Sequence, residues 1–175
     1  MIVGGGLIAK AFSKKYENDD SVIIFASGVS NSEENNISNF TRERNLLSHF
    51  LCKYPNLKFI YFSTILIDYK HNPYYAHKKE MEDLIKGNSK NYLIVRVPQL
   101  IGVSGNNNNL INYLITNIKN GINIDVYGDV KRALLDVGDL VNFIGYCKDL
   151  STCKSISVGG VEPISVVDLS KKIIL

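Results

Sequence analysis

A tyrosine and a lysine spaced four residues apart, Tyr75 and Lys79, are the residues of this 175-residue chain best suited to do chemistry together. On a helix this spacing puts both side chains on one face. A phenol with a pKa of about 10 is a poor base at neutral pH, and a nearby ammonium lowers that pKa by stabilising the phenolate. The pair is therefore a candidate for general acid–base catalysis. The plain alternative is an exposed helix pair.

Two hydroxyl side chains, Ser63 and Thr64, close an apolar segment shortly upstream of this pair. If that segment is a parallel strand, they lie at the carboxyl edge of the sheet, where ligands bind in open α/β folds. They would then be able to hydrogen-bond the same substrate oxygen as Tyr75. As turn caps they would have no catalytic role.

A glycine-rich turn near the start of the chain fits the pattern G-x-G-x-x-A. Glycines let the backbone approach a pyrophosphate, and the helix that follows contributes its N-terminal dipole. A tight turn without a ligand is the alternative. The predicted cofactor-binding residues are Gly4, Gly5, Gly6, Leu7 and Ile8.

Short apolar segments alternate with amphipathic ones, which predicts a parallel sheet covered by helices on both faces. We expect helices over 7–16, 39–53, 74–86, 110–119, 139–148 and 166–174. We expect strands at 1–3, 22–26, 59–63, 92–97, 122–127 and 155–158, an extended segment at 132–137 and a polar loop at 105–109.

Composition narrows the class of protein. A net charge of +3, from 20 basic and 17 acidic residues that are scattered along the chain, does not favour nucleic-acid binding. No segment is apolar enough for a membrane span, and the first residues do not read as a signal peptide. Neither the three cysteines nor the three histidines have metal-site spacing, and the cysteines suit a reducing cytoplasm.

Seven segments occur in an order and at spacings that resemble the extended short-chain dehydrogenase/reductase family, in its nucleotide-sugar epimerase, dehydratase and reductase group. They are residues 4–9, 22–26, 61–64, 73–79, 96–102, 127–139 and 157–169. The resemblance implies a Rossmann-type fold, NAD or NADP as cofactor, a nucleotide-sugar substrate and a role in surface polysaccharide biosynthesis. A homo-oligomer is compatible with the resemblance, which does not decide the oligomeric state.

The resemblance also implies roles for single residues. Tyr75 matches the catalytic tyrosine, and Lys79 the lysine that holds the nicotinamide ribose. Thr64 matches the hydroxyl partner, with Ser63 as the second choice. Arg132 falls where the family has an arginine near the sugar-nucleotide diphosphate, and Gln99 where many members place a substrate-contacting Asn.

Two departures from the family pattern change what is expected of this chain. The family has two strands and a helix, which carry the ribose-binding acid, between its first helix and the strand matching residues 22–26, and this chain has no counterpart of them. Asp19 and Asp20 do not replace that acid, because they precede the strand and do not follow it. Ile65 and Leu66 stand where the 4,6-dehydratases carry an Asp-Glu pair, so dehydration is not expected.

The sequence therefore predicts a single trimmed Rossmann-type domain over 1–175, with a core at 1–102 and interleaved substrate-lobe elements at 103–175. The leading interpretation is an NAD(P)-dependent oxidoreductase or epimerase acting on a nucleotide-linked sugar. A non-catalytic binding module and a structural subunit of an enzyme complex are the alternatives.

Overall fold

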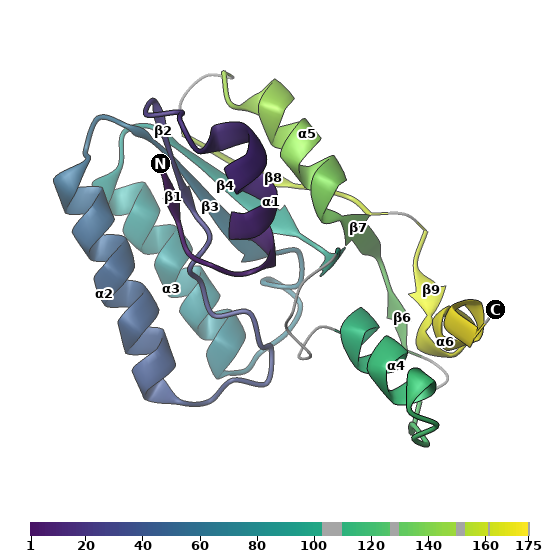
Figure 1. Cartoon of the computed structure of the whole chain (residues 1–175). Helices are drawn as coiled ribbons and strands as arrows, with labels where there is room; N and C mark the ends of the chain where they lie inside the picture. Colours follow the sequence, from purple (N-terminus) through teal and green to yellow (C-terminus); the bar gives the residue numbers. More distant parts are fainter. Residues whose placement is uncertain (103–109, 127–129, 150–152, 161, 175) are drawn as a thin grey trace.

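The computed structural model describes residues 1–102, 110–126, 130–149, 153–160 and 162–174. Five parallel strands form the main sheet in the order β1-β2-β3-β4-β8. Their bounds are β1 (Ile2–Val3), β2 (Val22–Phe25), β3 (Lys58–Thr64), β4 (Tyr92–Val97) and β8 (Lys154–Ser157). Helices cover both faces of this sheet, which confirms the predicted α/β class (Figure 1).

Both faces of the sheet are apolar, since successive side chains of a strand point to opposite faces. Ile24 and Ile60 face one cluster, with α1 (Leu7–Tyr16) and α5 (Val137–Cys147). Phe25 and Phe59 face the other, with α2 (Ile37–Lys53) and α3 (Pro73–Asn88). Burial on both sides explains why β2 reads as an unbroken apolar run and not as an alternating one.

The connection through α1 has an unusual geometry. β1, β2, β3 and β4 are consecutive neighbours, so each crossover between them steps in the same direction. α1 nevertheless packs on the face opposite to α2 and α3. The β1-α1-β2 crossover therefore has the opposite hand to the two that follow, whereas nearly all such units share the right hand. Only residues 17–21 separate α1 from β2, in keeping with the missing segment.

A smaller group of elements lies beyond the carboxyl ends of the strands (Figure 1). It contains α4 (Leu110–Lys119) and α6 (Val166–Ile174), which pack around Leu114 and Leu169. Two separate short strand pairs accompany it: β5 (Gln99–Ile101) with β7 (Leu134–Asp136), and β6 (Lys131–Arg132) with β9 (Ile164–Ser165). Within the described residues, no helix is long and apolar enough to cross a membrane.

The strand predicted at 122–127 is wrong for the part that the structure describes. Residues 122–126 form no strand. Gly121, with φ +64°, turns the chain at the end of α4, and the Ile122 N–H then donates to the Asn117 carbonyl over 2.9 Å. Ile124 and Val126 pack against the α4–α6 cluster and not beside a strand. The predicted loop at 105–109 lies outside the described residues.

Candidate active site

The glycine turn after β1 has the shape of a pyrophosphate cradle. Gly4 has φ +134°, and a Cβ there would lie 2.4 Å from the Ala26 carbonyl oxygen, so only glycine fits. A Cβ on Gly5 or Gly6 would meet nothing within 4 Å. No side chain caps the N-terminus of α1, where Gly6 is the cap residue. The open backbone and the uncapped N–H groups suit a phosphate.

Leu7 and Ile8 extend this site only through their backbone. The Leu7 side chain lies beside Gly102, where an added Cβ would come within 3.0 Å of it. Ile8 packs against the apolar cluster under α1. Their predicted role in cofactor binding is therefore limited to N–H groups in the first helical turn.

Tyr75 and Lys79 share one face of α3 and line a surface hollow with Ile67 and Asp68. The helix starts as its sequence dictates, because the Asn72 side chain accepts from the Tyr75 N–H over 3.1 Å. Tyr75 is only 6% exposed, whereas Lys79 is exposed. Among the described residues, no hydrogen bond joins the two side chains.

Tyr75 also lies within the field of two charged residues from other segments. Burial raises the pKa of the Tyr75 hydroxyl, Glu33 raises it further, and Arg132 lowers it. Arg132 belongs to β6, beyond the carboxyl ends of the strands. The charge of Arg132 therefore favours the ionised form of Tyr75, a residue that the sequence analysis had selected separately.

The two hydroxyls at the end of β3 have different surroundings. Thr64 Oγ1 accepts from the Leu66 N–H over 3.2 Å, so it caps the turn that leaves the strand. Its own hydroxyl proton stays available for donation. Ser63 is 4% exposed, and its buried hydroxyl has no hydrogen-bond partner among the described residues. Of the two, Thr64 is the one at the open edge.

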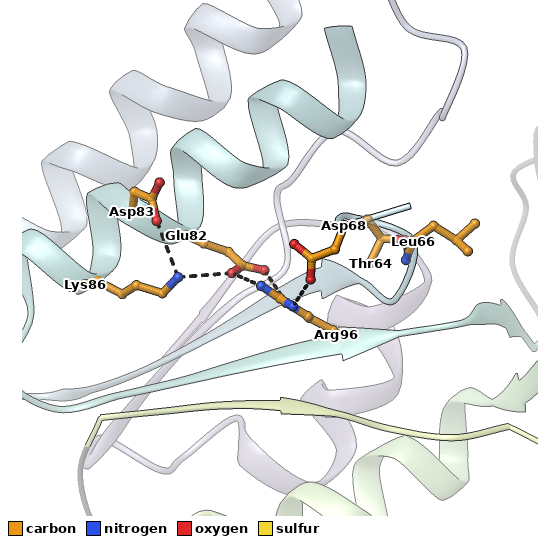
Figure 2. A network of polar contacts seen from close by, with 7 residues as sticks. All are labelled: Thr64, Leu66, Asp68, Glu82, Asp83, Lys86 and Arg96. Carbon is orange, nitrogen blue, oxygen red and sulfur yellow. Dashed lines mark hydrogen bonds and ion pairs between the residues drawn. The ribbon is translucent and has the colours of Figure 1, made fainter. Parts of the chain in front are cut away.

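An ion-pair network fixes α3 against this edge (Figure 2). Arg96 of β4 donates to both Glu82 oxygens, over 2.9 and 2.8 Å, and to Asp68 over 2.7 Å. Lys86 adds contacts to Glu82 and Asp83. Burial alone would raise the pKa of Glu82, but the Arg96 guanidinium outweighs it and holds that pKa below its usual range. The bidentate contact ties β4 to the helix that carries the tyrosines, and the Asp68 contact adds the turn after β3.

A second tyrosine–lysine pair, Tyr74 and Lys78, lies on the inner face of the same helix. Its side chains are 8% and 3% exposed. Lys78 Nζ is 3.2 Å from Glu43 Oε1 and 3.1 Å from the Tyr61 hydroxyl. A Cβ on Gly28 would lie 2.7 Å from Lys78 Nζ. Lys78 is thus packed directly beneath the turn that follows β2.

Glu43 of α2, which is fully buried, is the centre of this inner cluster. Its carboxylate accepts from the Val29 N–H over 2.5 Å and from the Tyr61 hydroxyl over 2.7 Å, and lies 3.1 Å from His77 Nε2. Burial would raise the pKa of Glu43, but Lys78 and these hydrogen bonds lower it to about 2. The same burial, reinforced by Glu43, raises the pKa of Tyr74 well above its usual value.

Sequence reasoning missed this inner cluster, although a signal for it was present. Tyr74, Lys78, Met81 and Ile85 recur at i, i+4, i+7 and i+11, which is the apolar side of an amphipathic helix. Glu43 likewise shares a face of α2 with the buried Leu47 and Leu51. A charged residue on such a face needs a buried partner, and Glu43 has two on α3, His77 and Lys78.

The predicted substrate residues lie where the smaller group begins. Gln99 is in β5, opposite Leu134 of β7, and its side chain donates to the Leu100 carbonyl over 3.3 Å. Arg132 is in β6, opposite Ile164, and donates to the Lys131 carbonyl over 3.2 Å. Gln99 lies just after the end of β4, whereas Arg132 is the last residue of β6, and only Arg132 acts on Tyr75 through its charge.

The side of the site that would face an adenosine ribose carries no acid. Ala26, Ser27 and Gly28 follow β2. Arg42 donates to the Ser27 hydroxyl over 3.1 Å and to the Ser27 carbonyl over 3.0 Å. β1 is the edge strand of the described sheet, so no further strand supplies the missing wall. The residues present fit the pyrophosphate of a dinucleotide but leave its adenosine end without a carboxylate partner.

The fold is a shortened Rossmann-type domain with an open glycine turn after β1 and a tyrosine helix at the carboxyl edge of the sheet. Residues 6–149 match the NAD dependent epimerase/dehydratase family, and the chain belongs to that family. A search of curated proteins gave no match.

Solved structures share this fold at low sequence identity. Three of them are dTDP-glucose 4,6-dehydratase from Bacillus anthracis str. Ames in complex with NAD, UDP-glucuronic acid 4-epimerase from Bacillus cereus in complex with UDP-glucuronic acid and NAD, and dTDP-4-dehydrorhamnose reductase from Bacillus anthracis str. Ames in complex with NADP. The identities are 19%, 16% and 23%, and the TM-scores are 0.73, 0.73 and 0.68. The matches cover 94%, 93% and 95% of this chain but 59%, 60% and 65% of those proteins.

Proposed function

We propose that this chain binds NAD or NADP and acts as an oxidoreductase or epimerase on a nucleotide-linked sugar. The observation that carries the proposal is the open cradle at Gly5 and Gly6, at the same sheet edge as Thr64 and Tyr75. Family membership and the NAD- and NADP-bound relatives named above support it. The nicotinamide would supply the hydride chemistry, and the protein would supply binding and orientation.

The residues at this sheet edge would each have a separate role in catalysis or substrate binding. Tyr75 would give a proton to, or take one from, the sugar oxygen whose carbon exchanges hydride, with Thr64 donating a hydrogen bond to that oxygen. Lys79 would pair with Tyr75 and would hold the nicotinamide ribose. Arg132 would attract the substrate diphosphate, and Gln99 would contact the substrate. Ile65 and Leu66 offer no carboxylate for elimination, so a dehydratase is the least supported member of the class.

Turnover with several substrates tests this function directly. The oxidation or reduction of nicotinamide is followed by absorbance, with NAD or NADP and a panel of UDP- and dTDP-linked sugars. Redox-neutral epimerisation is followed by chromatography of the sugar products. Conversion of one nucleotide sugar, absent without cofactor, is the expected result. A panel with no conversion despite cofactor binding would overturn the catalytic proposal. A role in surface polysaccharide biosynthesis in the cytoplasm extends this proposal.

One observation favours a second function, a nucleotide-binding module without catalysis. Within the described residues, neither Lys78 nor Lys79 forms a hydrogen bond with the tyrosine four residues before it. Lys78 is engaged by Glu43, and Lys79 is exposed. Cofactor or nucleotide-sugar binding without turnover, in a chain with an intact fold, would identify this second function.

A further inference from the structure

We propose that Arg42 binds a phosphate group of the cofactor, on the side of the site that carries no acid. The inference rests on the proposed function, because it concerns the same bound NAD or NADP. The phosphate is either the pyrophosphate of both cofactors or the 2′-phosphate of NADP alone. The two differ in which cofactor loses affinity when Arg42 is removed, so binding tests the inference without any turnover.

Arg42 is connected to the glycine turn through one intermediate residue, Ser27. A Cβ added to Gly4 would lie 2.4 Å from the Ala26 carbonyl oxygen and 3.0 Å from the Ser27 nitrogen, so the turns after β1 and β2 are in contact. The Arg42 guanidinium donates to the Ser27 hydroxyl over 3.1 Å and to the Ser27 carbonyl over 3.0 Å. A cation of α2 therefore lies next to the backbone that would cradle a pyrophosphate.

The Arg42 guanidinium is held in place and still exposed to solvent. Its hydrogen bonds to Ser27 use one N–H of each terminal nitrogen, whereas a guanidinium has five N–H donors. Arg42 is an exposed residue, and no carboxylate of the described residues forms an ion pair with it. An arginine oriented by neutral acceptors keeps its charge and a planar fork, which suit a phosphate.

The acidic residues that flank Arg42 in the sequence have other partners. Glu43, the next residue, is buried and pairs with Lys78 over 3.2 Å. Glu34, which precedes α2, accepts from the Asn39 side chain over 2.7 Å. Neither carboxylate therefore neutralises the guanidinium beside the glycine turn.

A second cation lies against the turn that follows β2. A Cβ on Gly28 would lie 2.7 Å from Lys78 Nζ, while Arg42 is bonded to the preceding residue, Ser27. Burial lowers the pKa of Lys78 most, Glu43 raises it, and the positive charge of Arg42 lowers it again. The guanidinium and the ammonium are thus close enough to repel each other, which favours an anionic ligand at this turn.

The two phosphates predict different affinities in the wild type. An acid that holds the ribose hydroxyls would repel a 2′-phosphate, and an arginine near the ribose accommodates it. If Arg42 binds the 2′-phosphate, NADPH should bind about tenfold more tightly than NADH, because one charge-assisted contact is added. If Arg42 binds the pyrophosphate, the two affinities should agree within about twofold.

Calorimetric titration of the intact chain with NADPH, NADH and 2′,5′-ADP measures this contact in the wild type, Arg42→Met and Arg44→Met. Arg44 is the matched control, because it is an exposed arginine of the same helix that pairs with Glu80. Arg42→Met should weaken NADPH binding about tenfold, and Arg44→Met should leave it within about twofold. A parallel loss of NADH binding identifies the pyrophosphate, and a loss confined to NADPH and 2′,5′-ADP identifies the 2′-phosphate.

A salt series separates a charged contact from stacking of the guanidinium on the adenine ring. Wild-type affinity for NADPH should fall when NaCl rises from about 50 to about 300 mM, and that of Arg42→Met should fall less, because salt screens an exposed ion pair. Arg42→Lys keeps the charge but not the planar fork, so it should lose only about threefold. A loss in Arg42→Met that is equal at both salt concentrations and equal in Arg42→Lys would overturn the inference.

The inference and the proposed function fail in different ways. Unchanged binding of both cofactors in Arg42→Met would refute the inference and leave the proposed function standing. Arg42-dependent binding without turnover of any nucleotide sugar would refute the proposed function alone, and a wild type that binds none of the three ligands at millimolar concentration would refute both. If the melting curve shows that Arg42→Met does not fold, Arg42→Gln, which keeps a side-chain donor near Ser27, replaces it.

Discussion

Arg96→Met removes the guanidinium that fastens α3 to the turn after β3, and it should destabilise the protein strongly. Glu82 is fully buried, and two of its contacts come from Arg96 at 2.9 and 2.8 Å (Figure 2). Breaking a buried ion pair by removing one partner costs roughly 3 kcal/mol, because the remaining charge is left in the interior. For a domain of this size the melting temperature should fall by about 6–12 °C.

The cost of Arg96→Met should depend on pH in a defined direction. In the wild type the pKa of Glu82 is lowered by Arg96, so its stabilisation is present above the unfolded-state pKa and is lost as pH falls. In the variant, burial raises the pKa of Glu82 and protonation relieves the unpaired charge. The gap in unfolding free energy between the two proteins should therefore narrow from pH 7 to pH 4.

Urea unfolding, monitored by circular dichroism at both pH values, measures this gap. Arg44→Met is the matched control, because its ion pair with Glu80 is about half exposed and should contribute less than about 1 kcal/mol. Equal losses in Arg96→Met and Arg44→Met, or a gap that widens in acid, would refute the reasoning.

Other substitutions probe the remaining parts of the site. Gly4→Ala should cost roughly 2 kcal/mol or more in urea unfolding, because its Cβ would collide with the Ala26 carbonyl at positive φ; Gly5→Ala, with open space, should change stability by less than about 0.5 kcal/mol. If the chain is an enzyme, Tyr75→Phe should lower its turnover about a hundredfold while leaving the melting curve intact, and undiminished turnover would exclude Tyr75 as the acid–base group. Glu43, whose pKa falls from 4.5 to about 2, should stabilise the wild type above pH 4.5 and lose that contribution as pH falls toward 2; an acid titration of unfolding free energy that is the same in Glu43→Gln would contradict this.

Local patterns in the sequence were sufficient to predict most helices and strands of the core. Apolar periodicity and caps predicted α1, α4 and α6 with the bounds that the structure shows, and placed the strands of the main sheet within two residues. These elements are specified by neighbours in the chain. The segment at 122–126 was misread because Ile122, Ile124 and Val126 alternate like a strand. That alternation serves packing onto α4 and α6, which only the tertiary structure reveals.

The crossover through α1 was beyond sequence reasoning for a different reason. The hand of a crossover depends on which face of the sheet its helix covers. The sequence of an amphipathic helix looks the same for either face, so it does not predict the hand. The strand pairs of β5 with β7 and of β6 with β9 were also not predicted. Each strand is three residues or fewer, too short for a period to show.

At the site, residue types were easier to predict than their surroundings. The glycine turn and Thr64 both lie at carboxyl ends of strands in the main sheet, and the shared site with Tyr75 stays a prediction. The sequence analysis weighed one tyrosine–lysine pair, whereas α3 carries two overlapping pairs whose burial differs. Glu43 could be found only by pairing α2 with α3, because its partners are 14 to 35 residues away along the chain.

Calorimetric titration of NADPH and NADH into the wild type, with the oligomeric state measured alongside, decides most directly whether the glycine turn holds a dinucleotide. We expect a dissociation constant between about 10 μM and 1 mM, because the pyrophosphate cradle is present while the adenosine ribose has no acid. Gly5→Val should weaken this binding about tenfold or more, since its side chain would enter the open cradle. No heat of binding at millimolar cofactor, or sub-micromolar affinity in a monomer, would contradict this expectation.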